Sequence, residues 1–78
     1  MNDKVRERVL SGRSDANIRF DDLRRLPIRL GFAERIRGSH HIFAKEGVRE
    51  LLVLQRDGSR AKPYQVRQVQ EVMIKYGL

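Results

Sequence analysis

Cysteine is absent from this chain of 78 residues. Its absence rules out a disulfide framework and a cysteine-based zinc site, and it suits a reducing cytoplasm. A chain this short buries only about 60% of its unfolded surface. The core must therefore be small, and functional groups are expected on the outside. The length allows a single domain, residues 1–78.

Long apolar runs are also missing. The longest, Leu51 to Leu54, is far shorter than the roughly 20 residues that a membrane-spanning helix needs. The first residues, Met1 to Lys4, lead into charged, helix-like sequence instead of an apolar signal region. We therefore expect a cytoplasmic protein without a membrane partner.

Acidic residues are few compared with basic ones. Lys and Arg total 17 against 10 Asp and Glu, so the formal net charge is +7, and most of the basic residues are arginines. Because the planar guanidinium makes bidentate phosphate contacts, this balance is typical of proteins that bind polyanions such as nucleic acids. The alternative, a domain that is merely basic and soluble, stays open at this point.

Apolar periodicity predicts two helices in the N-terminal half. The first covers residues 3–10 within a short N-terminal segment, 1–12, closed by Gly12, and a polar turn follows at 11–17. A core over 17–78 then begins with a second helix, capped by Asp21 and ending at Gly31. Pro27 lies inside it, and because proline removes a helical hydrogen bond, we expect a kink or a short break before Pro27.

The period changes to two after residue 31, which predicts strands. They are expected over 32–37, 40–45 and about 48–55, with turns at Gly38-Ser39 and Glu46-Gly47. The apolar run in the third strand suggests burial on both faces or a central edge covered by helices. Pro63 is suited to the first position of a last helix that Gly77 ends. The order α-α-β-β-β-α indicates an α+β fold, a three-stranded antiparallel sheet packed against helices.

Both histidines follow the Gly38-Ser39 turn. An imidazole at the first position of a strand, next to a corner, is partly exposed on a fixed support, and its ordinary pKa of about 6.5 suits a general base. The competing interpretation is a structural histidine, which is far more common. Neighbouring side chains of a strand point to opposite faces, so His40 and His41 should not face one substrate, and His41 is expected to pack or to orient.

Three stretches carry a resemblance to a known family: Gly31-Phe32, residues 37–43 (RGSHHIF) and residues 62–69 (KPYQVRQV). In these stretches, and over nearly the whole chain, the sequence resembles HicA-type toxins of bacterial toxin–antitoxin pairs. Pro27 departs from the family pattern. The resemblance implies a fold like that of double-stranded-RNA-binding domains. It also implies an mRNA interferase, an endoribonuclease that a HicB-type antitoxin keeps inactive.

In that family the catalytic histidine directly follows Gly-Ser, which here is His40. RNA cleavage without a metal or other cofactor needs a base for the ribose 2′-OH and cations for the charge that grows on phosphorus. No metal-ligand spacing is evident in the sequence. The general acid is not evident either, and Tyr64 is one possibility. The residues expected to bind RNA are Arg37, Ser39, Arg60 and Lys62.

Two other functions compete with this prediction. A non-catalytic RNA-binding module would use the same fold and charge, but it needs no titrating group at the corner. A DNA-binding regulator is a weaker alternative, because the sequence has no obvious helix-turn-helix pair.

Overall fold

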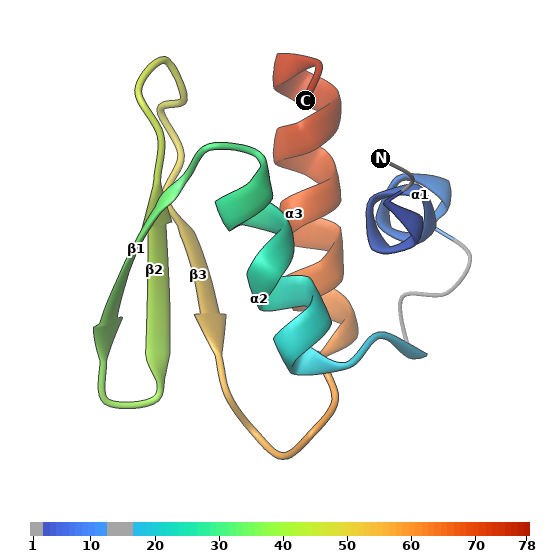
Figure 1. The fold of residues 1–78 in the computed structure, drawn as a ribbon, viewed down its shortest axis with the longest axis vertical. Helices are drawn as coiled ribbons and strands as arrows, with labels where there is room; N and C mark the ends of the chain where they lie inside the picture. Colours follow the sequence, from blue (N-terminus) through green and yellow to red (C-terminus); the bar gives the residue numbers. More distant parts are fainter. Residues whose placement is uncertain (1–2, 13–16) are drawn as a thin grey trace.

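The computed structural model describes residues 3–12 and 17–78 (Figure 1). Its elements follow the predicted order α-α-β-β-β-α: α1 (Lys4–Ser11), α2 (Phe20–Arg29), β1 (Ala33–Arg37), β2 (His40–Ala44), β3 (Leu52–Gln55) and α3 (Pro63–Tyr76). Most of the turn predicted over 11–17 falls outside the described residues. Among the helices that are described, none is long and apolar enough to cross a membrane.

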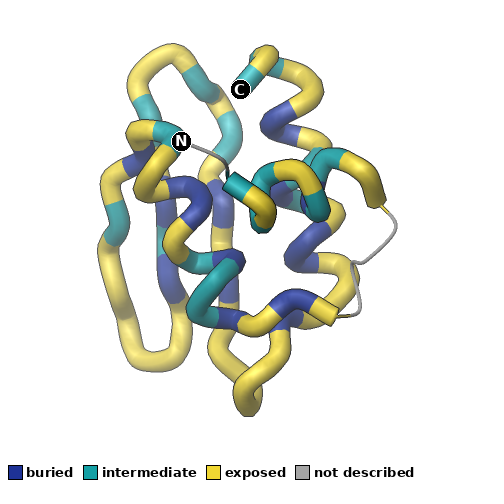
Figure 2. The backbone as a smooth tube through the Cα atoms, turned by 45° about the vertical axis from the view of Figure 1, so that its right-hand side comes forward, coloured by how far each residue is buried: buried dark blue, intermediate teal, exposed yellow. Residues whose placement is uncertain are grey.

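The elements form layers. The strands make one antiparallel sheet in the order β1-β2-β3, α2 and α3 cover one of its faces, and α1 lies beyond them on the side away from the sheet (Figure 1). The buried positions lie where these elements face each other (Figure 2). The other face of the sheet is left uncovered by the described helices. The apolar core consists of Val9, Ile18, Phe20, Leu23, Leu26, Phe32, Phe43, Leu52, Leu54, Ala61, Val66, Val69, Val72 and Met73.

The first and last helices begin and end within one residue of where the sequence predicts. The Asp3 carboxylate accepts a hydrogen bond from the Arg6 amide at the start of α1, and Gly12 ends the helix with φ 71°. Pro63 is at the first turn of α3, and Gly77 follows its end with φ 66°. Local signals suffice here because capping depends on neighbouring residues only.

The predicted cap of α2 is wrong. The helix begins at Phe20 with Arg19 as its N-cap residue, and Asp21 lies within the first turn. Long-range backbone contacts decide this start, because Arg19 forms a β-bridge with Arg60 and the Phe20 amide donates to the Ser59 carbonyl. The Asp21 carboxylate instead forms an ion pair with Arg56.

Of the kink or short break predicted before Pro27, the break is wrong, since α2 runs on to Arg29. Pro27 is buried near the end of the helix, where its own carbonyl accepts hydrogen bonds from the amides of Leu30 and Phe32. Proline so close to the C-terminus of a helix removes one hydrogen bond but interrupts no following turn. Burial of its ring and these terminal bonds offset the loss.

The third strand is shorter than predicted and lies at an edge of the sheet. It begins only at Leu52, after a turn in which the Val48 amide donates to the Lys45 carbonyl. Leu52 and Leu54 are buried, whereas Leu51 and Val53 are exposed, so burial on both faces is wrong. A four-residue apolar run cannot reveal this, because it fits an edge strand with one buried face equally well.

Candidate active site

The Gly38-Ser39 turn joins β1 to β2 and holds His40 at its exit. Gly38 has φ 59°, and a glycine at the first of two central positions is the pattern of a type II′ hairpin turn. The Ser39 carbonyl accepts a hydrogen bond from the Arg56 amide, 3.0 Å away, which ties the turn to the residue after β3. His40 therefore follows a turn that is held both by the β1–β2 hairpin and by the hydrogen bond from Arg56.

The strand register puts His40 in the middle of a row of three polar side chains. Arg37 of β1 lies opposite His40, and Gln55 of β3 lies opposite it on the other side. Directly opposed residues of antiparallel strands point to the same face, here the face that no described helix covers. All three residues are exposed. The next row on this face consists of Arg35, Ile42 and Val53.

His41 points the other way and is buried, as strand alternation predicts. Its Nδ1 lies 2.9 Å from Glu34 Oε2, and its ring meets the Phe20 ring edge-on at a centroid distance of 5.2 Å. The Arg24 guanidinium donates two hydrogen bonds to the same carboxylate, over 2.7 and 2.8 Å. The Arg24–Glu34–His41 network thus ties α2, β1 and β2 together directly behind His40.

The carboxylate of Glu34 is negatively charged in this network. Burial raises its pKa, but the hydrogen bonds from Arg24 and His41 outweigh burial and hold the pKa below its usual value. A second contact supports the network from the loop side, because the Arg56 guanidinium lies 4.6 Å from the Phe20 ring centroid. Arg56 thereby connects the ring that packs on His41 with the amide that holds Ser39.

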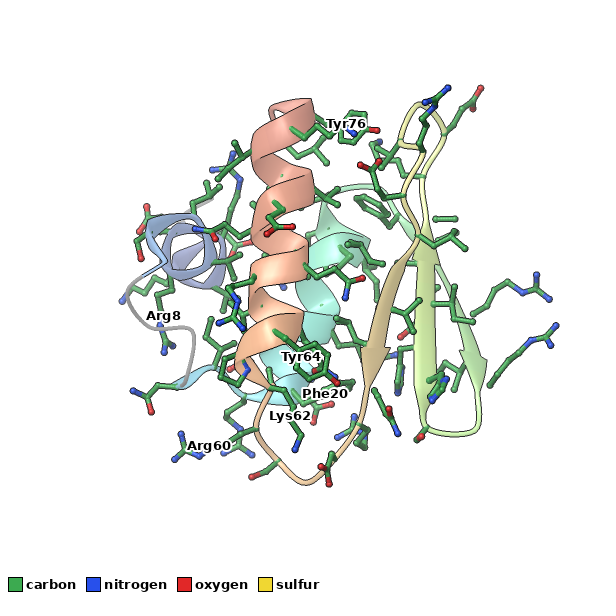
Figure 3. All side chains as sticks on the ribbon, turned by 180° about the vertical axis from the view of Figure 1, so that it is seen from behind. Arg8, Phe20, Arg60, Lys62, Tyr64 and Tyr76 are labelled. Atoms are coloured by element: carbon green, nitrogen blue, oxygen red, sulfur yellow. The ribbon has the colours of Figure 1, made fainter. Side chains whose placement is uncertain are left out.

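The predicted RNA-binding residues fall into two groups. Arg37 and Ser39 adjoin His40, whereas Arg60 and Lys62 lie in the loop between β3 and α3 (Figure 3). Arg60 Nη1 donates to the Asn17 side chain over 3.2 Å, and Lys62 Nζ forms a 2.8 Å ion pair with Asp57. The loop is at the same end of the molecule as the Gly38-Ser39 turn (Figure 1). Both of these predicted RNA-binding cations, Arg60 and Lys62, are, however, already engaged within the chain.

The suggested general acid, Tyr64, is exposed at the first turn of α3 (Figure 3). Its hydroxyl lies 3.5 Å from the side-chain nitrogen Nε2 of Gln65, and the same Nε2 also donates to the backbone carbonyl of Gln55. Tyr64 is therefore next to the outer edge of β3, not in the row of His40.

Gln55 and Arg35 belong to the open face of the sheet, and sequence reasoning missed both. Gln55 could have been found by pairing strands, but the register across β2 and β3 depends on where β3 begins. In the sequence, Glu34 is recognisable only as one residue of the alternating pattern that predicts the first strand. Its pairing with Arg24 and His41 has no signal in sequence spacing.

No group of three or more His, Asp or Glu side chains suitable for a metal occurs in the part of the chain that the structure describes. Comparisons with protein-family models, curated proteins and solved structures give no match for this chain. Its function must therefore be argued from the site itself.

Proposed function

We propose that this protein is a cytoplasmic, metal-independent endoribonuclease that cleaves mRNA, the toxin of a toxin–antitoxin pair. The observation that carries the proposal is the setting of His40. It is an exposed imidazole on an open sheet face, flanked by Arg37 and Gln55, on a backbone fixed by the turn and by the buried neighbour His41.

The proposed reaction is an internal transfer within the RNA. His40 accepts the proton of a ribose 2′-OH, and the resulting oxygen attacks the adjacent phosphorus. A bond from O2′ to phosphorus forms while the bond from phosphorus to O5′ breaks. O5′ takes a proton from solvent water and His40 returns its proton to solvent, which leaves a 2′,3′-cyclic phosphate and a 5′-hydroxyl. The guanidinium of Arg37 is the nearest cation in the register and stabilises the charge on the phosphorane.

Binding is proposed to use the positive charge of the open face and of the nearby loop. Arg37 and Ser39 contact the phosphates next to the cleaved bond, and Arg60 and Lys62 extend the contact along the strand. Lys62 must first give up Asp57, and Arg60 must give up Asn17, so each contributes less than Arg37. The charge of +7 also suits an acidic antitoxin that covers the His40 corner and competes with RNA.

The decisive experiment compares wild-type protein with His40→Ala on a labelled mRNA fragment. Since general base catalysis contributes about 10²–10⁴-fold, the variant should lose at least that order of rate. Its circular dichroism should stay as in the wild type, because the side chain is exposed. Its RNA affinity should stay similar, because the proposed phosphate contacts come from Arg37, Ser39, Arg60 and Lys62. Arg49→Ala is the matched control and should cleave normally. It removes an exposed arginine from the connection between β2 and β3, which lies at the opposite end of the sheet from the Gly38-Ser39 turn (Figure 1).

A substrate test checks the chemistry directly. RNA with a single 2′-deoxy nucleotide at the cleaved position should resist cleavage there, and mass spectrometry should find a 2′,3′-cyclic phosphate on the normal product. Cleavage of the 2′-deoxy substrate would contradict the proposed attack. Tight RNA binding with no cleavage by the wild type would favour the second candidate, a non-catalytic RNA-binding module that uses the same arginine-bearing sheet face.

A further inference from the structure

The two edges of the sheet differ in how their backbone groups are satisfied. At the β3 edge the Gln68 side chain accepts from the Val53 amide over 2.8 Å and donates to the Val53 carbonyl over 3.3 Å. The Gln65 side chain donates to the Gln55 carbonyl over 2.9 Å. Two glutamines of α3 thus occupy the position of a further strand, and this edge is closed to strand pairing.

The register identifies the corresponding groups on β1. Arg37 and His40 flank a two-residue turn, so they form a hydrogen-bonded pair, and such pairs alternate along an antiparallel ladder. Glu34 and Ile36 are therefore the residues of β1 whose amide and carbonyl point outward. The same rule applied to β3 selects Val53 and Gln55, which are the two residues that the glutamines hold.

The outward edge of β1 is open. In residues 3–12 and 17–78, no other segment is paired with this edge, and no hydrogen bond to its outward groups is found. Ile36 is 55% exposed although it points toward the helix side of the sheet. This edge therefore offers both unpaired backbone groups and apolar surface.

Charge decides which occupant fits the β1 edge. Arg35 and Arg37 are exposed on the open face, whereas the acidic residue of the strand, Glu34, is already paired with Arg24 and hydrogen-bonded to His41 on the other face. A second copy pairing antiparallel about Ile36 would place Arg35 directly beside Arg37 of its partner. Like charges in direct opposition are destabilising, so a strand with acidic residues on that face fits better.

We propose that the β1 edge binds an extended strand of an acidic partner protein. Alternate residues of that strand are acidic beside Arg35 and Arg37, and the residues between them are apolar and pack on Ile36. The backbone ladder to Glu34 and Ile36 supplies affinity, and the side chains supply specificity. Because the added strand continues the sheet next to the Arg37–His40 row, the rest of the partner protein would cover the His40 side chain. The inference rests on the sheet and its charges, not on RNA cleavage.

The test is an NMR titration of the full-length His40→Ala protein with a short synthetic peptide in which glutamate alternates with valine. The amides of Glu34 and Ile36 should shift and exchange more slowly with solvent, while those of Val53 and Gln55 should not change. A peptide of the same length with lysine in place of glutamate should bind at least about tenfold more weakly.

Two variants sharpen the result. Ile36→Glu should weaken binding of the glutamate peptide about tenfold, because it removes apolar contact and adds a repelling charge to the edge. Ile74→Glu makes the same change at an exposed position on α3 and should leave the affinity unchanged. Perturbation away from β1, or equal binding of both peptides, would overturn the proposal. So would dimerisation through β1 in sedimentation experiments, or protection of Glu34 and Ile36 by an RNA oligonucleotide. The titration contains no RNA substrate, so its failure leaves the cleavage activity standing.

Discussion

Removing the carboxylate of Glu34 should expose how much the buried network contributes to stability. This carboxylate receives two hydrogen bonds from Arg24 and one from His41, and its side chain is only 12% exposed. In Glu34→Ala, the His41 imidazole, 8% exposed, loses its polar partner Glu34, and the Arg24 guanidinium loses its acceptor. Water has little access to the His41 imidazole and more access to the Arg24 guanidinium.

The magnitude follows from this burial. Breaking a buried ion pair by deleting one partner costs about 3–5 kcal/mol. Arg24 is 27% exposed and can be partly rehydrated, so we expect about 2–3 kcal/mol for Glu34→Ala. For a domain of this size that is a large part of a total of about 4–12 kcal/mol. It corresponds to a fall in Tm of about 10–20 °C.

The assay is thermal and urea unfolding followed by circular dichroism. Glu34→Gln keeps one acceptor oxygen and should lose less stability than Glu34→Ala. Glu46→Ala removes an exposed carboxylate from a turn and is the matched control, expected within about 0.5 kcal/mol of the wild type. If Glu34→Ala also stays within that range, the network does not stabilise the fold, and the account of how His41 holds the strand behind His40 is refuted.

The pH dependence gives an independent check on the same carboxylate. The pKa of Glu34 is lower in the folded protein than in the unfolded chain. The stability that it contributes is therefore fully present above the unfolded value of about 4.5 and is lost as the pH falls through the folded-state pKa. Wild-type protein should lose its advantage over Glu34→Gln below about pH 4.5. An advantage that is constant from neutral pH to pH 2 would contradict a charged Glu34.

Two further predictions concern the corner and its cations. RNA binding by His40→Ala should weaken steeply with salt: the logarithm of the binding constant should fall against the logarithm of the salt concentration with a slope of about −0.7 per phosphate contact. Adding Arg37→Ala should reduce that slope by about one contact, whereas adding Arg49→Ala should leave it unchanged. Equal slopes for the two variants would show that Arg37 does not contact RNA. Gly38→Ala should lower the free energy of unfolding in urea by about 1–2 kcal/mol, because Gly38 has φ 59°, which is unfavourable for a residue with a Cβ. An added Cβ meets no atom within 4 Å, so the loss is conformational and not steric. A stability equal to that of the wild type would show that the turn adapts.

The sequence by itself determined the element order and the ends of most elements. Gly12, Pro63 and Gly77 act through their own backbone geometry, so their effect is local. The two-residue turn at Gly38-Ser39 likewise determined where β2 begins and, through strand alternation, that His40 and His41 point to opposite faces. These features need no knowledge of distant residues.

Only the tertiary structure decided which side chains surround the histidines. Arg24, on α2, meets Glu34 and His41 because the helix packs on the sheet, and Gln55 joins the row of His40 because β3 begins at Leu52. The start of α2 depends in the same way on the bridge between Arg19 and Arg60, far apart in the chain. Contacts of this kind arise from packing between separate elements, and residue spacing along the sequence does not contain them.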